Sequence, residues 1–590
     1  MHAIAKTAIA ARCGVLHRAA GRRSIDHRSA GSNTASPATF TPNTRADAAE
    51  TGSGQNEPQV AVDQTGRAYV DWQSSAGVGG SAAASTDDGA SFNYLSDPDP
   101  SRGNPIDGDV DMATTSWPAL VHTASTSGSG DNGIFFGHLN KGTCGAIEIR
   151  DSSSNNAGTT WGTADASCAP AQVDRPWIAA YTPPANRGTP TAVANTEVFN
   201  EYHDFASSEI FVTRSFNGGA TWDPVQYPAI APTSVEHATT FCNSIPSGIA
   251  VDQWGAHQGR VYVLWETADQ PNNVAQGCDI TQAEAFDHVF LSWSDEIGNS
   301  AATTPTWHST AVFNDPCAPN PPTPPAPTCA TQDVSELFNS LAVDDAGNVF
   351  ATWIFRDITR TPVEYDVYAS ESTDGGNTFG PRHKVNHDAG THYMPWVAAG
   401  AGGVIDVVYY GTPAVEATGA LNKPMAAPST AVWDVYLEQS FDGGQTFGPA
   451  NKVSDASDTS GGIYFGDICT TGIFCSATPP GSNWGADRIL FDDFGVAIGP
   501  DGGARLIWTD ARASHTGACI PGGTVSCQTT HVMFACQSGG LGLHGETITG
   551  CGRTLGARIP EVPWAPGVVF IASGIAVASL AGLRRRRFRG

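Results

Sequence analysis

Several acidic side chains and one tyrosine have types and settings suited to acid–base chemistry on a sugar. Two carboxyl groups about 5–10 Å apart, or a Tyr–Glu pair with a further acid, can cleave a glycosidic bond. The candidates stand near the ends of predicted inner strands, as in the segments 174–177 and 201–204. The candidate catalytic residues are Asp174, Glu201, Tyr393, Asp493 and Asp510.

Arginine and tryptophan residues near the same positions suit substrate binding. A guanidinium group binds a carboxylate in bidentate fashion, and an indole ring offers a sugar an apolar face. The alternative interpretation is that each Asp–Arg pair is a structural salt bridge and each Trp is packing, because clustered charges are often structural. The candidate substrate-binding residues are Arg175, Trp177, Trp396, Arg488 and Arg512.

The elements that position these residues are repeats. One octet recurs: Ser, any residue, Asp or Asn, any residue, Gly, any residue, Thr or Ser, aromatic. Asp or Asn accepts backbone N–H bonds in a turn, and Gly supplies a positive φ, so each octet predicts a hairpin. The five copies begin at Ser85, Ser154, Ser215, Ser372 and Ser440, with a degraded copy near residues 294–307.

Pairs of apolar strands joined by Gly turns recur between the octets, as in 58–72 and 339–353. Two inner strands followed by a hairpin give four strands, the form of a propeller blade. We therefore predict an all-β propeller of six to seven four-stranded blades. The predicted units start near Pro58, Trp117, Pro176, Ser247, Asn339, Met394 and Phe494.

The octets resemble the Asp-box (BNR) repeats of the sialidase superfamily, over about residues 57–536. The resemblance implies that the boxes lie on the rim, away from a central site. It also implies an Arg-Ile-Pro motif on the first inner strand, an Arg triad, a Tyr–Glu pair and an acid/base Asp. Here that strand begins Glu57-Pro58, and the only Arg-Ile-Pro lies at 558–560. The enzyme class therefore stays open, with glycoside hydrolase favoured.

The composition limits the partners. A net charge of -27 argues against nucleic acid, which needs a basic surface. The acidic segment Asp107, Asp109, Asp111 is either a calcium ligand set or a solvated turn, and no other cofactor is expected.

The cysteines predict an oxidising compartment. Apart from Cys13, they fall into near neighbours, which is typical of disulfides in exported proteins. Buried free thiols are the alternative. The expected pairs are 144/168, 242/278, 317/329, 469/475, 519/527 and 536/551.

The C-terminal end predicts membrane attachment. Residues 564–583 carry no charge, and about 20 apolar residues span a bilayer core. Five arginines follow within 584–590 and would stay cytoplasmic. The tail resembles PEP-CTERM-type sorting signals, which implies that it can be processed.

The expected organisation has five parts. A basic, then disordered segment covers 1–55 and holds an atypical export signal, and the propeller covers 56–540. A linker (541–563), a transmembrane helix (564–583) and an Arg-rich tail (584–590) follow. The sequence thus predicts a monomeric surface ectodomain that binds or hydrolyses glycans, or a non-catalytic adhesion or scaffold propeller.

Overall fold

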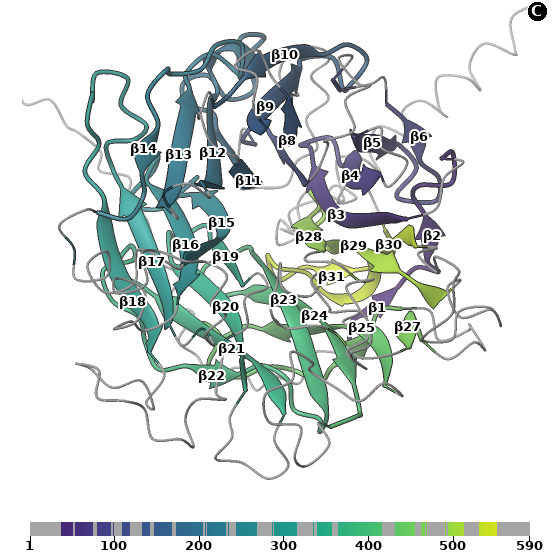
Figure 1. Cartoon of the computed structure of the whole chain (residues 1–590). Helices are drawn as coiled ribbons and strands as arrows, with labels where there is room; N and C mark the ends of the chain where they lie inside the picture. The colour runs from purple at the N-terminus through teal and green to yellow at the C-terminus, as the bar shows by residue number, and fades with distance from the viewer. Residues whose placement is uncertain are drawn as a thin grey trace, which may run out of the picture. The chain divides into compact units, whose positions relative to one another are not determined.

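Strand segments rich in Val, Ile, Ala and aromatic residues form seven antiparallel sheets in the computed structural model (Figure 1). The structure describes residues 37–551 with gaps. The longer gaps are 100–108, 118–132, 235–243, 268–285, 315–333, 416–430, 469–489 and 513–529. The sheets lie around a common centre, with strands β3, β11, β15 and β23 among those nearest to it.

The first three blades follow one another along the chain. Blade 1 holds β3 (Gln55–Val62), β4 (Ala68–Ser74), β5 (Gly79–Ser85) and β6 (Asn93–Tyr94). Blade 2 holds β7 (Val110–Thr114), β8 (Ile134–Lys141), β9 (Ile147–Ser154) and β10 (Gly162–Asp165). Blade 3 holds β11 (Val173–Tyr181), a 3-10 turn η1 (Val193–Asn195), β12 (Glu197–Asp204), β13 (Glu209–Ser215) and β14 (Tyr227–Pro228).

The next three blades repeat this order. Blade 4 holds β15 (Ser244–Val251), β16 (Val261–Thr267), β17 (His288–Ser294) and β18 (His308–Asn314). Blade 5 holds β19 (Ser340–Val343), β20 (Val349–Arg356), β21 (Tyr365–Ser372) and β22 (His383–Lys384). Blade 6 holds β23 (Thr391–Ala399), β24 (Ile405–Thr412), β25 (Val432–Ser440), β26 (Asn451–Lys452) and β27 (Tyr464–Phe465).

Blade 7 joins the two ends of the described chain. Its strands are β28 (Gly495–Ile498), β29 (Ala504–Asp510), β30 (His531–Leu541) and β31 (Thr547–Ile548). The outer edge of β30 pairs with β1 (Thr39–Phe40) and β2 (Thr44–Arg45). The N-terminal segment thus supplies the outer strand of the last blade and closes the ring. This differs from the prediction that residues up to 55 are disordered.

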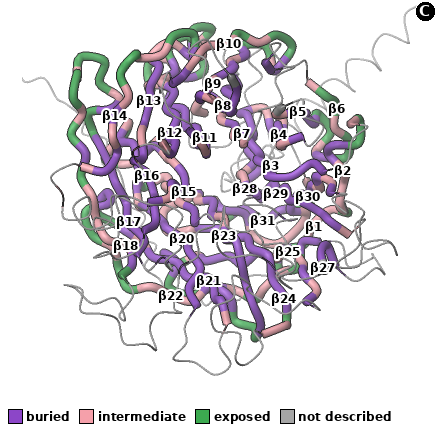
Figure 2. The backbone as a smooth tube through the Cα atoms, in the orientation of Figure 1, coloured by how far each residue is buried: buried purple, intermediate pink, exposed green. Residues whose placement is uncertain are grey.

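Apolar side chains fill the seams between neighbouring blades. One cluster joins blades 1 and 2 through Tyr69 and Met112, and another joins blades 7 and 1 through Phe534 and Val70. A larger cluster runs through blades 5, 6 and 7. Figure 2 shows the strands mostly buried and the exposed residues mostly at the periphery. The predicted propeller of about seven blades is confirmed.

The predicted unit starts agree with the inner strands in six blades and fail in blade 2. We placed that unit near Trp117, but its inner strand is β7, which ends at Thr114. The acidic stretch before Trp117 does not have the pattern of a strand, and the strand that it contains is only five residues long. Asp111, expected in a calcium site or solvated turn, lies inside β7, and its carboxylate accepts bonds from the amides of Met112 and Ile178, both at 2.7 Å.

Each clear octet forms the predicted turn after the third strand of its blade. In blade 1, Ser85 Oγ accepts from the Gly89 amide at 2.8 Å, and Asp87 accepts from the Ser91 amide at 2.9 Å. Gly89 has φ +82, and a Cβ there would lie 2.1 Å from the Phe534 ring of blade 7. Gly is therefore required twice, for backbone conformation and for packing against the preceding blade.

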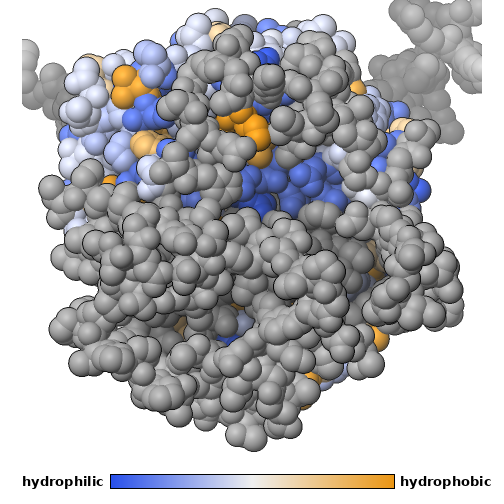
Figure 3. Space-filling model, in the orientation of Figure 1, coloured by the Kyte–Doolittle hydropathy of each residue, from blue (hydrophilic) through white to orange (hydrophobic). Residues whose placement is uncertain are grey.

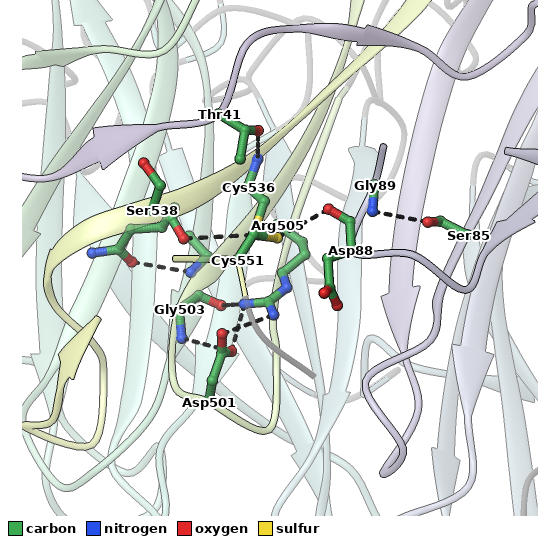
Figure 4. Close-up of a disulfide and its surroundings, with 12 residues drawn as sticks. Thr41, Ser85, Asp88, Gly89, Asp501, Gly503, Arg505, Cys536, Ser538 and Cys551 are labelled. Atoms are coloured by element: carbon green, nitrogen blue, oxygen red, sulfur yellow. Dashed lines mark hydrogen bonds and ion pairs between the residues drawn. A yellow bond between two sulfur atoms is a disulfide. The ribbon is translucent and has the colours of Figure 1, made fainter. Parts of the chain in front are cut away.

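A disulfide lies at the boundary between blades 7 and 1 (Figure 4). Cys536 of β30 is bonded to Cys551, as predicted, and Cys551 Sγ lies 3.1 Å from the Asp88 carbonyl oxygen in the first octet. On the other side, the Cys536 amide donates to Thr41 Oγ1 at 3.1 Å. The disulfide therefore lies between the N-terminal strands and the rim of blade 1. The other five predicted pairs lie outside the described residues.

The membrane prediction also lies outside this part of the chain. In the described ranges, no helix has the length and apolar character needed to cross a bilayer. The predicted span at 564–583 and the tail after it are not described.

Candidate functional site

The inner strands of blades 1, 3 and 6 share an irregularity near their starts. A bulge interrupts the pairing between Asn56 and Gln59 in β3, and the same happens in β11 and β23. In each case a residue with positive φ precedes a proline: Glu57 (49°), Arg175 (61°) and Met394 (52°). A bulge changes the direction in which the side chains of a strand point. These three equivalent positions are therefore candidates for a functional site.

The bulges of blades 1 and 3 bring their side chains together with blade 2. Arg175 Nη1 lies 3.8 Å from Glu57 Oε1, and Arg175 Nε lies 3.3 Å from Asp109 Oδ2 and 4.0 Å from Asp174 Oδ2. We call Glu57, Asp109, Asp174 and Arg175 the inner-strand cluster. Figure 3 shows mainly hydrophilic residues where described atoms are visible in the middle of this face.

The surroundings of Asp174 favour its protonated form. Burial and the negative charge of Asp109 raise the pKa of Asp174 to about 8, although Arg175 acts in the opposite direction. The Asp174 side chain keeps 23% of its surface exposed, so it is accessible to a ligand. A carboxylic acid that stays protonated beside a second carboxyl group is the usual arrangement of a proton donor in catalysis.

His203 lies next to this cluster on β12, where it pairs with Asp174. Burial and the charge of Arg175 lower the pKa of His203 to about 4, so its ring is neutral at physiological pH. It therefore adds no positive charge to the site.

The side chains of Trp177 in blade 3 and Trp396 in blade 6 pack against each other. They follow the equivalent prolines of blades 3 and 6, and their ring centroids are 5.2 Å apart. Trp177 is only 3% exposed, whereas Trp396 is partly exposed. Trp177 thus has little free ring surface for a sugar, and packing against Trp396 is its observed role. Trp396 can still present part of its surface.

Glu201 is not part of the inner-strand cluster. It pairs with Trp177 in the sheet and is fully buried. Burial raises the pKa of Glu201 well above its usual range, and the backbone amide of Gly248, in the bulge of blade 4, partly offsets this. Because Glu201 is fully buried, it has no surface to present to a sugar.

The remaining candidates are dispersed. Asp510 forms an ion pair with Arg512 at 2.6 Å within blade 7, which is the structural alternative raised for such pairs. Tyr393 is fully buried, with its ring 5.7 Å from Tyr365 of blade 5. The structure places it in the seam between blades. Arg488 and Asp493 lie outside the described residues.

A Tyr–Glu pair does occur, but in another place. Tyr409 donates to Glu438 Oε1 at 2.6 Å, and His387 Nδ1 lies 3.0 Å from Glu438 Oε2. Both Tyr409 and Glu438 are fully buried in blade 6. Burial raises the pKa of Glu438 to about 8. A nucleophile without exposed surface cannot reach a sugar, so this pair is structural.

Sequence reasoning found Asp174 and Arg175 but missed Glu57 and Asp109. Glu57 was noted only because an arginine is expected there, and Asp109 was placed in either a calcium ligand set or a solvated turn. The repeated residue–proline steps at 57–58, 175–176 and 394–395 were the available signal. In the described part of the chain, no group of three or more His, Cys, Asp or Glu side chains is arranged to hold a metal ion.

The fold and cluster define a seven-bladed β-propeller with an Arg–carboxylate network at its inner strands. No family model and no curated protein matches the sequence. Similar solved structures include a protein of unknown function from Dyadobacter fermentans, with 12% identity, TM-score 0.38, and coverage of 85% of this chain and 98% of that chain.

Glycan-active enzymes are also among these structures. The intramolecular trans-sialidase from Ruminococcus gnavus has 10% identity and TM-score 0.36, over 84% of this chain and 96% of that chain. The α-L-arabinanase from Penicillium chrysogenum has 11% identity and TM-score 0.34, over 85% and 98%. These values are too low to support an inference about function, and the fold assignment rests on the strand topology.

Proposed function

We propose that the protein is a carbohydrate-active propeller that binds a glycan at the inner-strand cluster and hydrolyses a terminal glycosidic bond. The observation that carries the proposal is the position of Asp174, which is partly exposed and lies beside Arg175 and Asp109 in surroundings that raise its pKa. This arrangement separates the two carboxyl roles of a glycosidase by environment.

The residues have distinct roles in this proposal. Asp174 gives its proton to the glycosidic oxygen as the bond from that oxygen to the anomeric carbon breaks. Water adds to the anomeric carbon, and its proton passes to a carboxylate. Asp109 suits that second role, because its side chain is 16% exposed and its Oδ2 lies 3.3 Å from Nε of Arg175. Arg175 holds both carboxyl groups in place and is a positioning residue.

The location is part of the same proposal. The Cys536–Cys551 disulfide supports folding in an oxidising compartment. The charge-free segment and arginines at 564–590 support a membrane anchor with the propeller outside. The ectodomain is proposed to act as a monomer on glycans or glycoconjugates.

The test is turnover by the purified ectodomain on a panel of 4-nitrophenyl glycosides, with binding to a glycan array measured in parallel. Asp174→Asn should lower kcat/KM by about 10²–10⁴-fold, the usual contribution of general acid–base catalysis. Asp374→Asn, in the octet of blade 5, is the matched control and should leave kcat/KM unchanged. An ectodomain that neither cleaves nor binds any panel member would exclude the proposal, as would full activity in Asp174→Asn.

A non-catalytic adhesion or scaffold propeller is the second candidate. It is favoured by Arg175, which three carboxyl groups already surround, and by the burial of Trp177 against Trp396. In that case the array would show binding and no glycoside would be cleaved. Asp174→Asn would then change only the affinity for the glycan.

A further inference from the structure

We infer that the inner-strand cluster takes uncharged sugars and discriminates against sugars that carry a carboxylate. This rests on the proposed function and names its substrate class. The inference comes from how Arg175 is used inside the protein.

The guanidinium of Arg175 is already occupied by carboxyl groups from three blades. Glu57 contacts it at Nη1, and Asp109 and Asp174 contact it at Nε. A carboxylate ligand binds arginine best through two parallel N–H bonds. Such a ligand would compete with these internal partners for the guanidinium.

Displacement has a high cost, because the partners are themselves poorly exposed. The side chain of Glu57 is 4% exposed and that of Asp109 is 16% exposed. Removing the counter-charge from a buried carboxylate is strongly unfavourable. Arg175 is therefore better suited to holding the site together than to receiving an anionic sugar.

The charge balance points the same way. The described cluster holds one guanidinium, Arg175, against three carboxyl groups, Glu57, Asp109 and Asp174, and the neutral His203 adds no positive charge. The whole chain carries a charge of -27. An approaching carboxylate meets like charge at close range, which costs binding free energy.

A neutral sugar fits these groups without such a conflict. Its hydroxyl groups can donate to the carboxyl oxygens of Asp109, and Asp174 in its protonated form can donate to a sugar oxygen. The partly exposed Trp396 adds an apolar surface nearby.

The experiment compares matched pairs that differ only at C6: 4-nitrophenyl glucosides against glucuronides, and galactosides against galacturonides, in both anomers. We expect kcat/KM of the purified ectodomain to favour the neutral member of a cleaved pair by at least about tenfold, which corresponds to about 1.4 kcal/mol. Raising NaCl from 20 to 300 mM should narrow that ratio, because salt screens repulsion at exposed charges.

Glu57→Gln supplies the second measurement. It removes one negative charge beside Arg175, so it should narrow the neutral-to-anionic ratio, whereas the rim variant Asp374→Asn should keep it. If Glu57→Gln does not fold, the salt series on the unmodified ectodomain decides. A preference for the uronide member would overturn the inference and leave the proposed function standing. Cleavage and binding of neither member, together with an inactive wider panel, would remove the proposed function itself.

Discussion

Aspartates at the rim and at the inner strands differ in the direction in which the fold shifts their pKa. At the rim, the hydroxyl and amide of Ser91 donate to Asp87 and lower its pKa, and Thr378 does the same for Asp374. At the inner strands, burial and the charge of Asp109 raise the pKa of Asp174 to about 8.

The difference shows what each region contributes. The rim aspartates are satisfied within their own eight residues and stay ionised, so their role is to hold a turn. Asp174 depends on neighbours from other blades and keeps a proton that can be transferred. The same side chain is thus structural in one region and a candidate acid in the other.

The largest effect on stability is expected where the rim packs against a neighbouring blade. Gly89→Ala places a Cβ 2.1 Å from the Phe534 ring at φ +82. Overpacking and backbone strain together should lower the free energy of unfolding by about 3–4 kcal/mol. Chemical denaturation of the purified ectodomain measures this.

Gly444→Ala is the matched control in blade 6. Its Cβ would lie 3.6 Å from Ile405, an ordinary contact, at φ +70. Only backbone strain remains, so we expect a cost of about 1 kcal/mol. Equal losses in the two variants would contradict the view that the octets join neighbouring blades.

The disulfide at the seam should rank next. Replacing Cys536 and Cys551 together by Ser opens a bridge that spans 15 residues. The loss of this constraint on the unfolded chain should lower stability by about 2–3 kcal/mol. Activity at the inner-strand cluster, which lies in blades 1 to 3, should be kept below the melting transition. A double variant that melts like the parent would show that the β1 and β2 pairing alone closes the ring.

Per pH unit, the pH dependence of stability is expected to be the smallest of these effects, and it separates the two regions by sign. The pKa of Asp174 is raised, so its contribution to stability is present below its ordinary pKa of 3.8 and is lost as pH rises towards about 8. The slope cannot exceed about 1.4 kcal/mol per pH unit for one proton. Asp174→Asn should therefore flatten the decline in unfolding free energy between pH 5 and 8.

Asp374 should behave in the opposite way. Because the pKa of Asp374 is lowered in the folded state, its contribution to stability is present above pH 3.8 and is lost as pH falls further. Asp374→Asn should change the acid limb of the stability curve and leave the range from pH 5 to 8 unaltered. If both variants altered the same limb, the contrast between rim and inner strands would be wrong.

The repeats made the fold predictable to a large extent. The five octets located five third-strand turns, and the pattern at residues 339–353 located β19 and β20. Blade 2 was misplaced because β7 is short and acidic. The strands at Thr39–Phe40 and Thr44–Arg45 escaped prediction because they pair with residues almost 500 positions away.

The site was only half predictable for a related reason. Asp174 and Arg175 are adjacent in sequence, so their pairing could be anticipated. Glu57 and Asp109 reach the same guanidinium from two other blades. The residue–proline step at 57–58 was the only local signal for Glu57, and Asp109 had none. Tyr393 and Glu201 carried suitable chemistry, but packing buries both.

The sequence by itself determined the turns and, through their repetition, the blades, because the Ser and Asp or Asn side chains of an octet bond to groups within the same eight residues. Only the tertiary structure decided which acids meet. The ring brings the starts of the inner strands together, and burial beside other charges sets whether a carboxyl group keeps its proton. The turns at the rim could therefore be predicted from the sequence, whereas the arrangement of side chains around Arg175 depended on the closed propeller.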